Sequence, residues 1–303
     1  MAGTAVLTGS TGWLGRSCIR ALRAIYPKLS FHLYSQTGKH FKLADGATFI
    51  TQEEERLPSL QLRADLFVPL SFLTQDFFLR YGRKEFEARN QQLIERAVNW
   101  MRMNRPLKVI LISSGAVENF EVGNKSVESY TSYARLKLLQ EHQLEKVARE
   151  EEISLAIVRA YSLSGPEMLN PEKYAMGNFI ISALKNESIR VTSQIKTYRS
   201  YCDAESLFLT AARILEKEKY VRFDSAGPIV EMYELAQCVN EVLKNQTAVI
   251  THSSEDHPED RSEYYSKSNA MFELMDELCI DKLDLREQIK RTAEGLVRFI
   301  RPT

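Results

Sequence analysis

The segment Thr8-Gly-Ser-Thr-Gly-Trp-Leu-Gly-Arg16 places glycines at positions 9, 12 and 15, directly after the apolar run Ala5-Val6-Leu7. A helical pattern over residues 13–25 follows it. A glycine-rich turn between a buried strand and a helix brings backbone N–H groups and the positive end of the helix to one point, where a pyrophosphate can bind. The spacing is also typical of an ordinary turn from strand to helix, so other segments have to decide between the two interpretations.

Short apolar runs alternate with longer helical patterns through the first half of the chain. This order predicts an α/β fold with a doubly wound parallel sheet. The predicted strands are Ala5–Leu7, Phe31–Tyr34, Thr48–Ile50, Leu66–Val68, Val109–Ile112 and Leu155–Val158, and the predicted helices cover residues 13–25, 84–103 and 130–150. Pro69 is expected at the exit of the fourth strand, because proline cannot donate to a central ladder.

After residue 165 the pattern becomes more irregular, with a short strand near 189–191, helices at about 205–216 and 231–244, and two further helical stretches. We therefore expect a dinucleotide-binding domain over residues 1–165 and a smaller, mainly substrate-binding lobe over residues 166–303. Some segments of that lobe are expected to return to the sheet. Ligands of such folds bind in a cleft at the carboxyl ends of the strands.

The composition is that of an ordinary globular protein, with 44% hydrophobic and 26% charged residues. Forty basic and forty acidic residues cancel, so no summed field attracts nucleic acid or an anionic membrane. The cysteines at positions 18, 202, 238 and 279 form no CxxC pair, which argues against zinc or disulfides and predicts buried thiols in a reducing cytosol. No segment has the roughly 18 apolar residues of a membrane span, so we expect a cytoplasmic protein. From the cysteine spacing we also expect no bound metal.

The loop at the start of the chain resembles that of the extended short-chain dehydrogenase/reductase family, which contains nucleotide-sugar epimerases, dehydratases and ketoreductases. The resemblance implies a Rossmann-type fold and a bound NAD or NADP. It assigns cofactor contacts to Gly9, Thr11, Gly12, Trp13, Leu14 and Gly15.

The segment after the second predicted strand indicates which dinucleotide is used. A site for NAD usually has a carboxylate about 20 residues after the loop, which holds the ribose diol. This chain has Ser35 there, and Lys39, His40 and Lys42 can face a 2′-phosphate. We therefore expect NADP(H), with Ser35, Gln36 and Lys39 as contacts. The alternatives are NAD(H), and lysines that are merely solvated.

A YxxxK motif, Tyr133-Ala-Arg-Leu-Lys137, lies on the predicted helix 130–150. Its two side chains share one helix face, and an ammonium beside a phenol lowers the phenol's pKa from its reference of about 10. Upstream, an apolar run ends in Ser113-Ser114, where a hydroxyl can hydrogen-bond a reacting carbonyl. The corresponding family strand ends in Val-Tyr-Gly, and counting back from Val117 makes Ser114, rather than Ser113, the catalytic hydroxyl. Two serines that only end a strand in a turn are the alternative.

Two more segments resemble cofactor-binding parts of the family. Asn90 matches the Asn that opens the family's helix motif Asn-Val-x-Gly-Thr, although the residues after it differ. The segment Pro69-Leu70-Ser71-Phe72 stands where the family often has His-Leu-Ala-Ala. The resemblance assigns cofactor contacts to Leu70, Ser71, Phe72 and Asn90. Because Phe72 is larger than the family's alanine, it would make this side of the cofactor site bulkier than usual.

The resemblance extends into the C-terminal half. In Arg159-Ala-Tyr-Ser-Leu-Ser-Gly-Pro166, Ser162 replaces a substrate-binding Asn of the family, and Asn178 and Phe179 lie in a segment like the one that flanks the nucleotide base. Arg199 resembles an arginine that contacts the substrate diphosphate, a role for which a planar guanidinium is suited. In His257-Pro-Glu-Asp260 the aspartate fits a ribose-binding position, while His257 replaces an arginine.

The resemblance also distinguishes between the reactions that members of the family catalyse. The dehydratases have Asp-Glu directly after the catalytic hydroxyl, and this chain has Gly115-Ala116. We expect an NADPH-dependent ketoreductase of a nucleotide-linked 4-keto-deoxy sugar, with Ser114, Tyr133 and Lys137 as catalytic residues. The resemblance also makes Tyr133 and Lys137 cofactor contacts. The first alternative is a nucleotide-sugar 4-epimerase with tightly bound NAD, and the second is a non-catalytic dinucleotide-sensing protein. By analogy with the family, a homodimer through the two long helices is expected.

Overall fold

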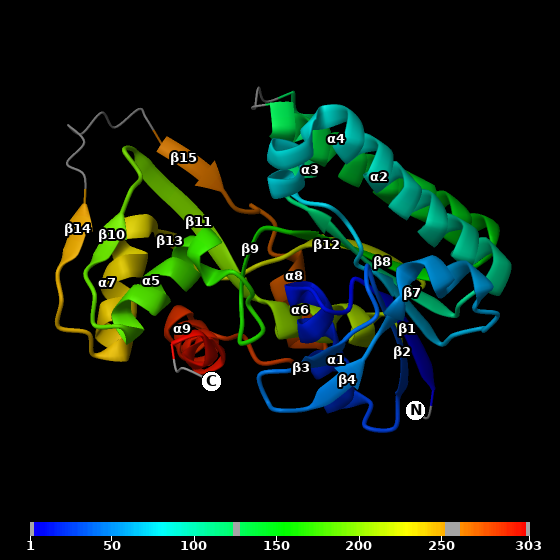
Figure 1. The fold of residues 1–303 in the computed structure, drawn as a ribbon, viewed down its shortest axis with the longest axis horizontal. Coiled ribbons are helices and arrows are strands. Elements are labelled where there is room, and N and C mark those ends of the chain that lie inside the picture. The colour runs from blue at the N-terminus through cyan, green and yellow to red at the C-terminus, as the bar shows by residue number, and fades with distance from the viewer. Residues whose placement is uncertain (1–2, 124–127, 252–260, 301–303) are drawn as a thin grey trace. The chain divides into compact units, whose positions relative to one another are not determined.

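The computed structural model describes residues 3–123, 128–251 and 261–300. The chain forms two compact units, each made of two segments. The first unit contains residues 1–160 and 208–224, and the second contains residues 161–207 and 225–303. Figure 1 labels most of the elements of both units and colours the chain from its N-terminus to its C-terminus.

The first unit is built on a seven-stranded sheet in which every neighbouring pair is parallel. The order is β12-β8-β7-β6-β1-β2-β5. The strands are β1 (Thr4–Thr8), β2 (Ser30–Ser35), β5 (Gln52–Glu53), β6 (Leu66–Pro69), β7 (Lys108–Ser114), β8 (Ser154–Ala160) and β12 (Tyr220–Asp224). The predicted α/β fold with a Rossmann-type parallel sheet is confirmed, and Pro69 is the last residue of β6.

The helices of this unit connect the strands. They are α1 (Trp13–Ile25), α2 (Gln75–Asn104), α3 (Ala116–Glu121) and α4 (Glu128–Glu150), together with the 3₁₀ helix η1 (Glu54–Ser59) and most of α6 (Ala204–Ile214). The long helices α2 and α4 run side by side (Figure 1). Helix α2 begins nine residues before the predicted start at residue 84, and Gly82, with φ of 79°, interrupts it. Between α2 and the sheet, the rings of Trp100 and Phe67 pack 4.5 Å apart in the core.

One predicted strand has a different position from the one expected. Thr48–Ile50 is strand β4, which pairs antiparallel with β3 (His40–Lys42) in a separate hairpin instead of joining the parallel sheet. Thr48 and Ile50 are exposed, so the hairpin buries only one face, on which the rings of Phe41 and Phe49 stack 5.8 Å apart. The sheet position next to β2 is taken by the short β5.

The second unit is built around the long strand β11 (Lys196–Asp203). It pairs antiparallel with β13 (Ile229–Glu231) and parallel with β15 (Arg261–Tyr264) and β9 (Ser162–Ser164). The remaining elements are η2 (Pro171–Lys173), α5 (Ala175–Leu184), β10 (Ile189–Val191), α7 (Met232–Leu243), β14 (Val249–Thr251), α8 (Ala270–Glu277), α9 (Leu285–Leu296) and η3 (Val297–Phe299). Helix α5 packs against α7 and α9, which gives this unit its own core.

The cysteines depart partly from expectation. Cys18 and Cys202 are buried, but Cys238 is half-buried and Cys279 is exposed, because Cys279 follows the end of α8 in a left-handed turn with φ of 52°. All four thiols are free. Within the described part of the chain, none of the helices combines the length and apolar character needed to cross a bilayer.

Candidate active site

The glycine turn between β1 and α1 is closely packed. Gly9 has φ of 62°, and a Cβ there would lie 2.8 Å from the carbonyl carbon of Leu70. A Cβ on Gly15 would lie 2.5 Å from the Gly9 carbonyl oxygen. Only glycine therefore lets the turn lie against both the loop after β6 and the start of α1. Gly12 is exposed, and its amide donates to the Gly9 carbonyl over 3.0 Å.

The start of α1 is suited to an anion. Gly12 is its N-cap, and within the described residues no side chain caps the helix. The first-turn amides of an uncapped helix are donors for a phosphate, and the helix dipole adds to their attraction. Thr11, Trp13 and Leu14 are half-buried around this turn. The residues present thus fit the diphosphate of a dinucleotide.

Ser35 ends β2 and is buried, and its hydroxyl bonds within the protein. Its Oγ donates to the Thr37 carbonyl over 2.7 Å and lies 2.7 Å from Thr51 Oγ1. Gln36 and Lys39 are exposed. The neighbouring strand β5 brings Glu53 level with Ser35, so a carboxylate stands on the strand beside the expected ribose position. The residues that directly follow the glycine loop do not reveal Glu53, because it reaches this position through the pairing of β5 with β2.

The loop after β6 is held at two points on either side of Phe72. The Ser71 amide donates to Thr8 Oγ1 over 3.2 Å, and its hydroxyl donates to Glu54 Oε2 over 2.6 Å. On the other side, Asn90 Oδ1 accepts the Leu73 amide over 2.8 Å and Asn90 Nδ2 donates to the Leu73 carbonyl over 3.3 Å. Asn90 is fully buried and anchors this loop, and Leu70 and Phe72 are half-buried beside it.

Ser114 is the last residue of β7, and 6% of its surface is exposed. Its Oγ accepts the Ala116 amide over 3.2 Å. Ser113 is the preceding residue, and since side chains alternate along a strand the two hydroxyls leave opposite faces of the sheet. The Ser113 hydroxyl is buried and bonds to no described group.

Tyr133 and Lys137 lie one turn apart on α4, which packs against β7. Lys137 Nζ donates to the Ile112 carbonyl over 3.0 Å and to Gln140 Oε1 over 3.1 Å, and it lies 3.9 Å from the centre of the Phe72 ring. The lysine is 7% exposed. Its burial lowers its pKa to about 7, and the charge of Glu141 opposes that shift.

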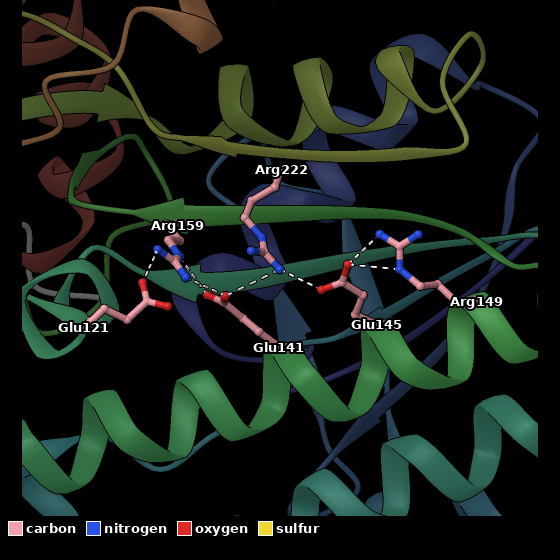
Figure 2. A network of polar contacts seen from close by, with 6 residues as sticks. All are labelled: Glu121, Glu141, Glu145, Arg149, Arg159 and Arg222. Atoms are coloured by element: carbon pink, nitrogen blue, oxygen red, sulfur yellow. Dashed lines mark hydrogen bonds and ion pairs between the residues drawn. The ribbon is translucent and has the colours of Figure 1, made fainter.

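A buried ion pair lies one turn further along α4. Figure 2 shows the Arg159 guanidinium at the end of β8 between two carboxylates. It donates to both oxygens of Glu141 over 3.0 and 2.9 Å and to Glu121 over 2.8 Å. Burial works to lower the pKa of Arg159, but these carboxylates raise it above its ordinary value. The network continues outward through Arg222, which donates to Glu145 over 2.7 Å.

The predicted substrate residues that the structure describes lie in the second unit. Ser162 pairs with Tyr201 of β11, two residues along the strand from Arg199. The Arg199 guanidinium donates to the Tyr198 carbonyl over 2.7 Å and lies 5.8 Å from the centre of the Tyr264 ring. Asn178 and Phe179 lie on α5, where Asn178 is half-buried.

Phe179 is 4% exposed and belongs to the core of the second unit. Asp260 and His257 are outside the described residues. Among the described residues, no group of three or more His, Cys, Asp or Glu side chains could hold a metal ion.

Comparison with known proteins identifies the family. Residues 5–223 match the model of the NAD dependent epimerase/dehydratase family. The chain belongs to this family. Its members are NAD(P)-dependent enzymes of the extended short-chain dehydrogenase/reductase type, and the predicted family is thereby confirmed.

The chain is similar over 179 residues to UDP-glucuronic acid decarboxylase 6 of Arabidopsis thaliana, with 25% identity. The match covers 53% of this chain and 50% of the plant protein. A structure of UDP-glucose 4-epimerase from Thermotoga maritima with UDP-glucose has a TM-score of 0.75 at 17% identity, with 98% of this chain and 100% of the other covered. The Bordetella bronchiseptica enzyme WbmF with NAD⁺ has a TM-score of 0.77 at 14% identity, over 99% and 94% of the two chains. Both structures share the fold.

Proposed function

We propose that the chain reduces a nucleotide-linked 4-keto-6-deoxy or 3,6-dideoxy sugar with NADPH. The observation that carries the proposal is the pairing of Tyr133 with a buried Lys137 on α4, in the unit that also holds the glycine turn. Ser114 ends β7, the strand against which α4 packs. Gly115-Ala116 after Ser114 supports reduction over dehydration, because no carboxylate stands there to remove water.

In this proposal each side chain has a separate task. The nicotinamide, when bound, supplies the hydride that reduces the keto carbon. Tyr133 gives the proton to the sugar oxygen, and Ser114 orients the carbonyl through a hydrogen bond. Lys137 places a positive charge one turn from Tyr133, which favours loss of the phenolic proton, and it would also bind the ribose of the cofactor.

For the cofactor we propose NADP(H), because Lys39 is exposed after β2 and Ser35 replaces the usual acid. Glu53 beside Ser35 is an observation that favours NAD(H) instead. For the substrate we propose that Arg199 binds the diphosphate, with Ser162, Asn178, Phe179 and Asp260 near the sugar and nucleoside. A homodimer through α2 and α4 is part of the same proposal, and light scattering would measure it.

A second candidate is a nucleotide-sugar 4-epimerase that retains its NAD. The names of the solved relatives favour it, since the Thermotoga maritima protein and one from Thermus thermophilus are both called UDP-glucose 4-epimerase. In that reaction the hydride returns to the sugar, and no dinucleotide is consumed.

The experiment that separates the two candidates starts from the purified protein. Mass spectrometry identifies any bound dinucleotide, and NADPH absorbance is followed with a panel of nucleotide-linked 4-keto sugars. We expect stoichiometric loss of NADPH with a reduced sugar as product. Retained NAD with sugar interconversion and no net oxidation would replace this proposal by the epimerase.

The catalytic assignment is tested with two tyrosines of the same helix. Tyr133→Phe is expected to lower kcat by at least about 100-fold, as for loss of a general acid. Tyr130→Phe is the matched control, because Tyr130 is 49% exposed near the start of α4, and it should keep full turnover. Full turnover by Tyr133→Phe would refute the assignment.

A further inference from the structure

Phe72 touches both residues of the YxxxK pair. Its ring centre lies 3.9 Å from Lys137 Nζ, within the range of a cation–π contact. Its ring also stands perpendicular to that of Tyr133, at 89° with the centres 5.6 Å apart. This is the edge-to-face arrangement that aromatic pairs prefer. The family often has His-Leu-Ala-Ala in this segment, with alanine at the position of Phe72. An alanine there would make neither contact.

The ammonium of Lys137, which has three N–H donors, makes three contacts among the described residues. Two are hydrogen bonds, to the Ile112 carbonyl on β7 and to Gln140 on α4, and the third direction is closed by the face of Phe72. Lys137 is 7% exposed and Gln140 is 2% exposed, so little water reaches the ammonium. Phe72 is therefore part of what orients the ammonium.

The backbone around Phe72 is fixed before any ligand binds. Ser71 is bonded to Thr8 and Glu54, and Leu73 is bonded at both its amide and its carbonyl to Asn90. A ring carried between two such anchors has little freedom to move away from Lys137. The arrangement is that of a rigid supporting residue.

We propose that Phe72 is a positioning residue, whose ring holds the Lys137 ammonium in its charged form and braces the Tyr133 ring beside it. This inference rests on the proposed function, in which Tyr133 and Lys137 carry the proton transfer. Among the described residues, the ionisable groups facing Lys137 include Glu141 on its own helix, which also binds Arg159 of β8, and Tyr133, which contacts the same Phe72 ring. The loop after β6 contributes the aromatic face of Phe72 instead of a charge.

The test measures the titration of Lys137 directly, without substrate. Lysine labelled with ¹³C and ¹⁵N at the end of the side chain is followed by NMR across pH, and the Lys137 signal is assigned by its loss in Lys137→Met. Phe72→Leu keeps an apolar side chain but removes the aromatic face, and Phe72→Tyr keeps the face. Thermal unfolding shows that each variant is folded.

We expect Phe72→Leu to lower the pKa of Lys137 by about half to one pH unit, because a cation–π contact that favours the ammonium is lost. Phe72→Tyr is expected to restore the wild-type value. The direction of the change in the pKa of Lys137 distinguishes this role from one in which Phe72 only fills space. A loosened site would admit water and raise the pKa toward its ordinary value. An unchanged or raised pKa in Phe72→Leu, or the same shift in Phe72→Tyr, would overturn the proposal.

Turnover provides the second measurement. If the chain is a ketoreductase, Phe72→Leu should lower kcat several-fold with KM for the sugar little changed, and Phe72→Tyr should recover it. If no 4-keto sugar is reduced by the wild type, the proposed function fails, while the Lys137 titration still decides the role of Phe72.

Discussion

Lys137 is a basic side chain buried within a few ångströms of a π face and two acceptors. Its burial lowers its pKa to about 7 in the folded chain, against an ordinary value of 10.5. Between these two values the unfolded chain holds a proton that the folded chain has released. The free energy of unfolding therefore rises with pH in this window as far as Lys137 determines it.

Lys137→Met removes this dependence. Above pH 7, we expect the unfolding free energy of the wild type to increase relative to that of the variant. The increase should be up to about 1.4 kcal/mol for each pH unit. Urea unfolding at several pH values from 6 to about 10 measures it. Lys146→Met is the control, since the Lys146 side chain is 70% exposed on the same helix and folding hardly changes its surroundings. Equal pH profiles for the two variants would contradict the argument.

At the scale of elements, β8 and α4 are joined by the ion pair of Arg159 with Glu141, whose side chain has no exposed surface. Helix α4 carries a second, outer carboxylate one turn later, Glu145, which bonds to Arg222 and Arg149 (Figure 2). A buried charge left without its partner is costly, whereas exposed ion pairs contribute little. The two carboxylates of one network should therefore differ strongly in their effect on stability.

Glu141→Gln keeps the shape of the side chain but, among the described residues, leaves Arg159 with Glu121 as its one charged partner. We expect it to lower the free energy of unfolding by about 3 kcal/mol. Glu145→Gln, on the same helix and in the same network, should cost at most about 1 kcal/mol, because its arginines are about half exposed. Denaturant unfolding of both variants measures the contrast. Equal losses would show that burial does not determine the strength of this network.

The strands differ in how clearly the sequence pattern predicts them. Ala5–Leu7 and Val109–Ile112 are continuous apolar runs because their strands are covered on both faces, and both were predicted as strands of the parallel sheet. Strand β5 consists of Gln52–Glu53, and both residues are exposed. No apolar pattern marks such an edge strand, so the sequence predicts the nearby run Thr48–Ile50 as the strand instead.

Across the whole molecule, long-range pairings were the least predictable features of the site. The spacing of Tyr133 and Lys137 follows from one helix and could be seen in the sequence. The contact of Phe72 with both, and that of Arg159 with Glu141, join segments 18 to 65 residues apart. Only the folded chain brings such pairs together. Folding also brings Ser71 to Glu54, a buried carboxylate. Burial raises the pKa of Glu54, and the hydrogen bond from Ser71 opposes that shift.

The last prediction concerns the boundary expected at residue 165. The first unit also contains residues 208–224, whose strand β12 pairs with β8 along its whole length. This segment also contributes the buried side chains of Phe208, Leu215 and Phe223 to the unit. A fragment ending at residue 165 would expose an apolar strand edge and lose these contacts. We expect it to aggregate or to lack a cooperative thermal transition, whereas a longer fragment that ends at residue 226, with a flexible linker in place of residues 161–203, keeps the whole first unit and should unfold cooperatively. Calorimetry and light scattering of both measure this, and a cooperative transition in the shorter fragment at a temperature equal to that of the longer one would show that β12 is dispensable.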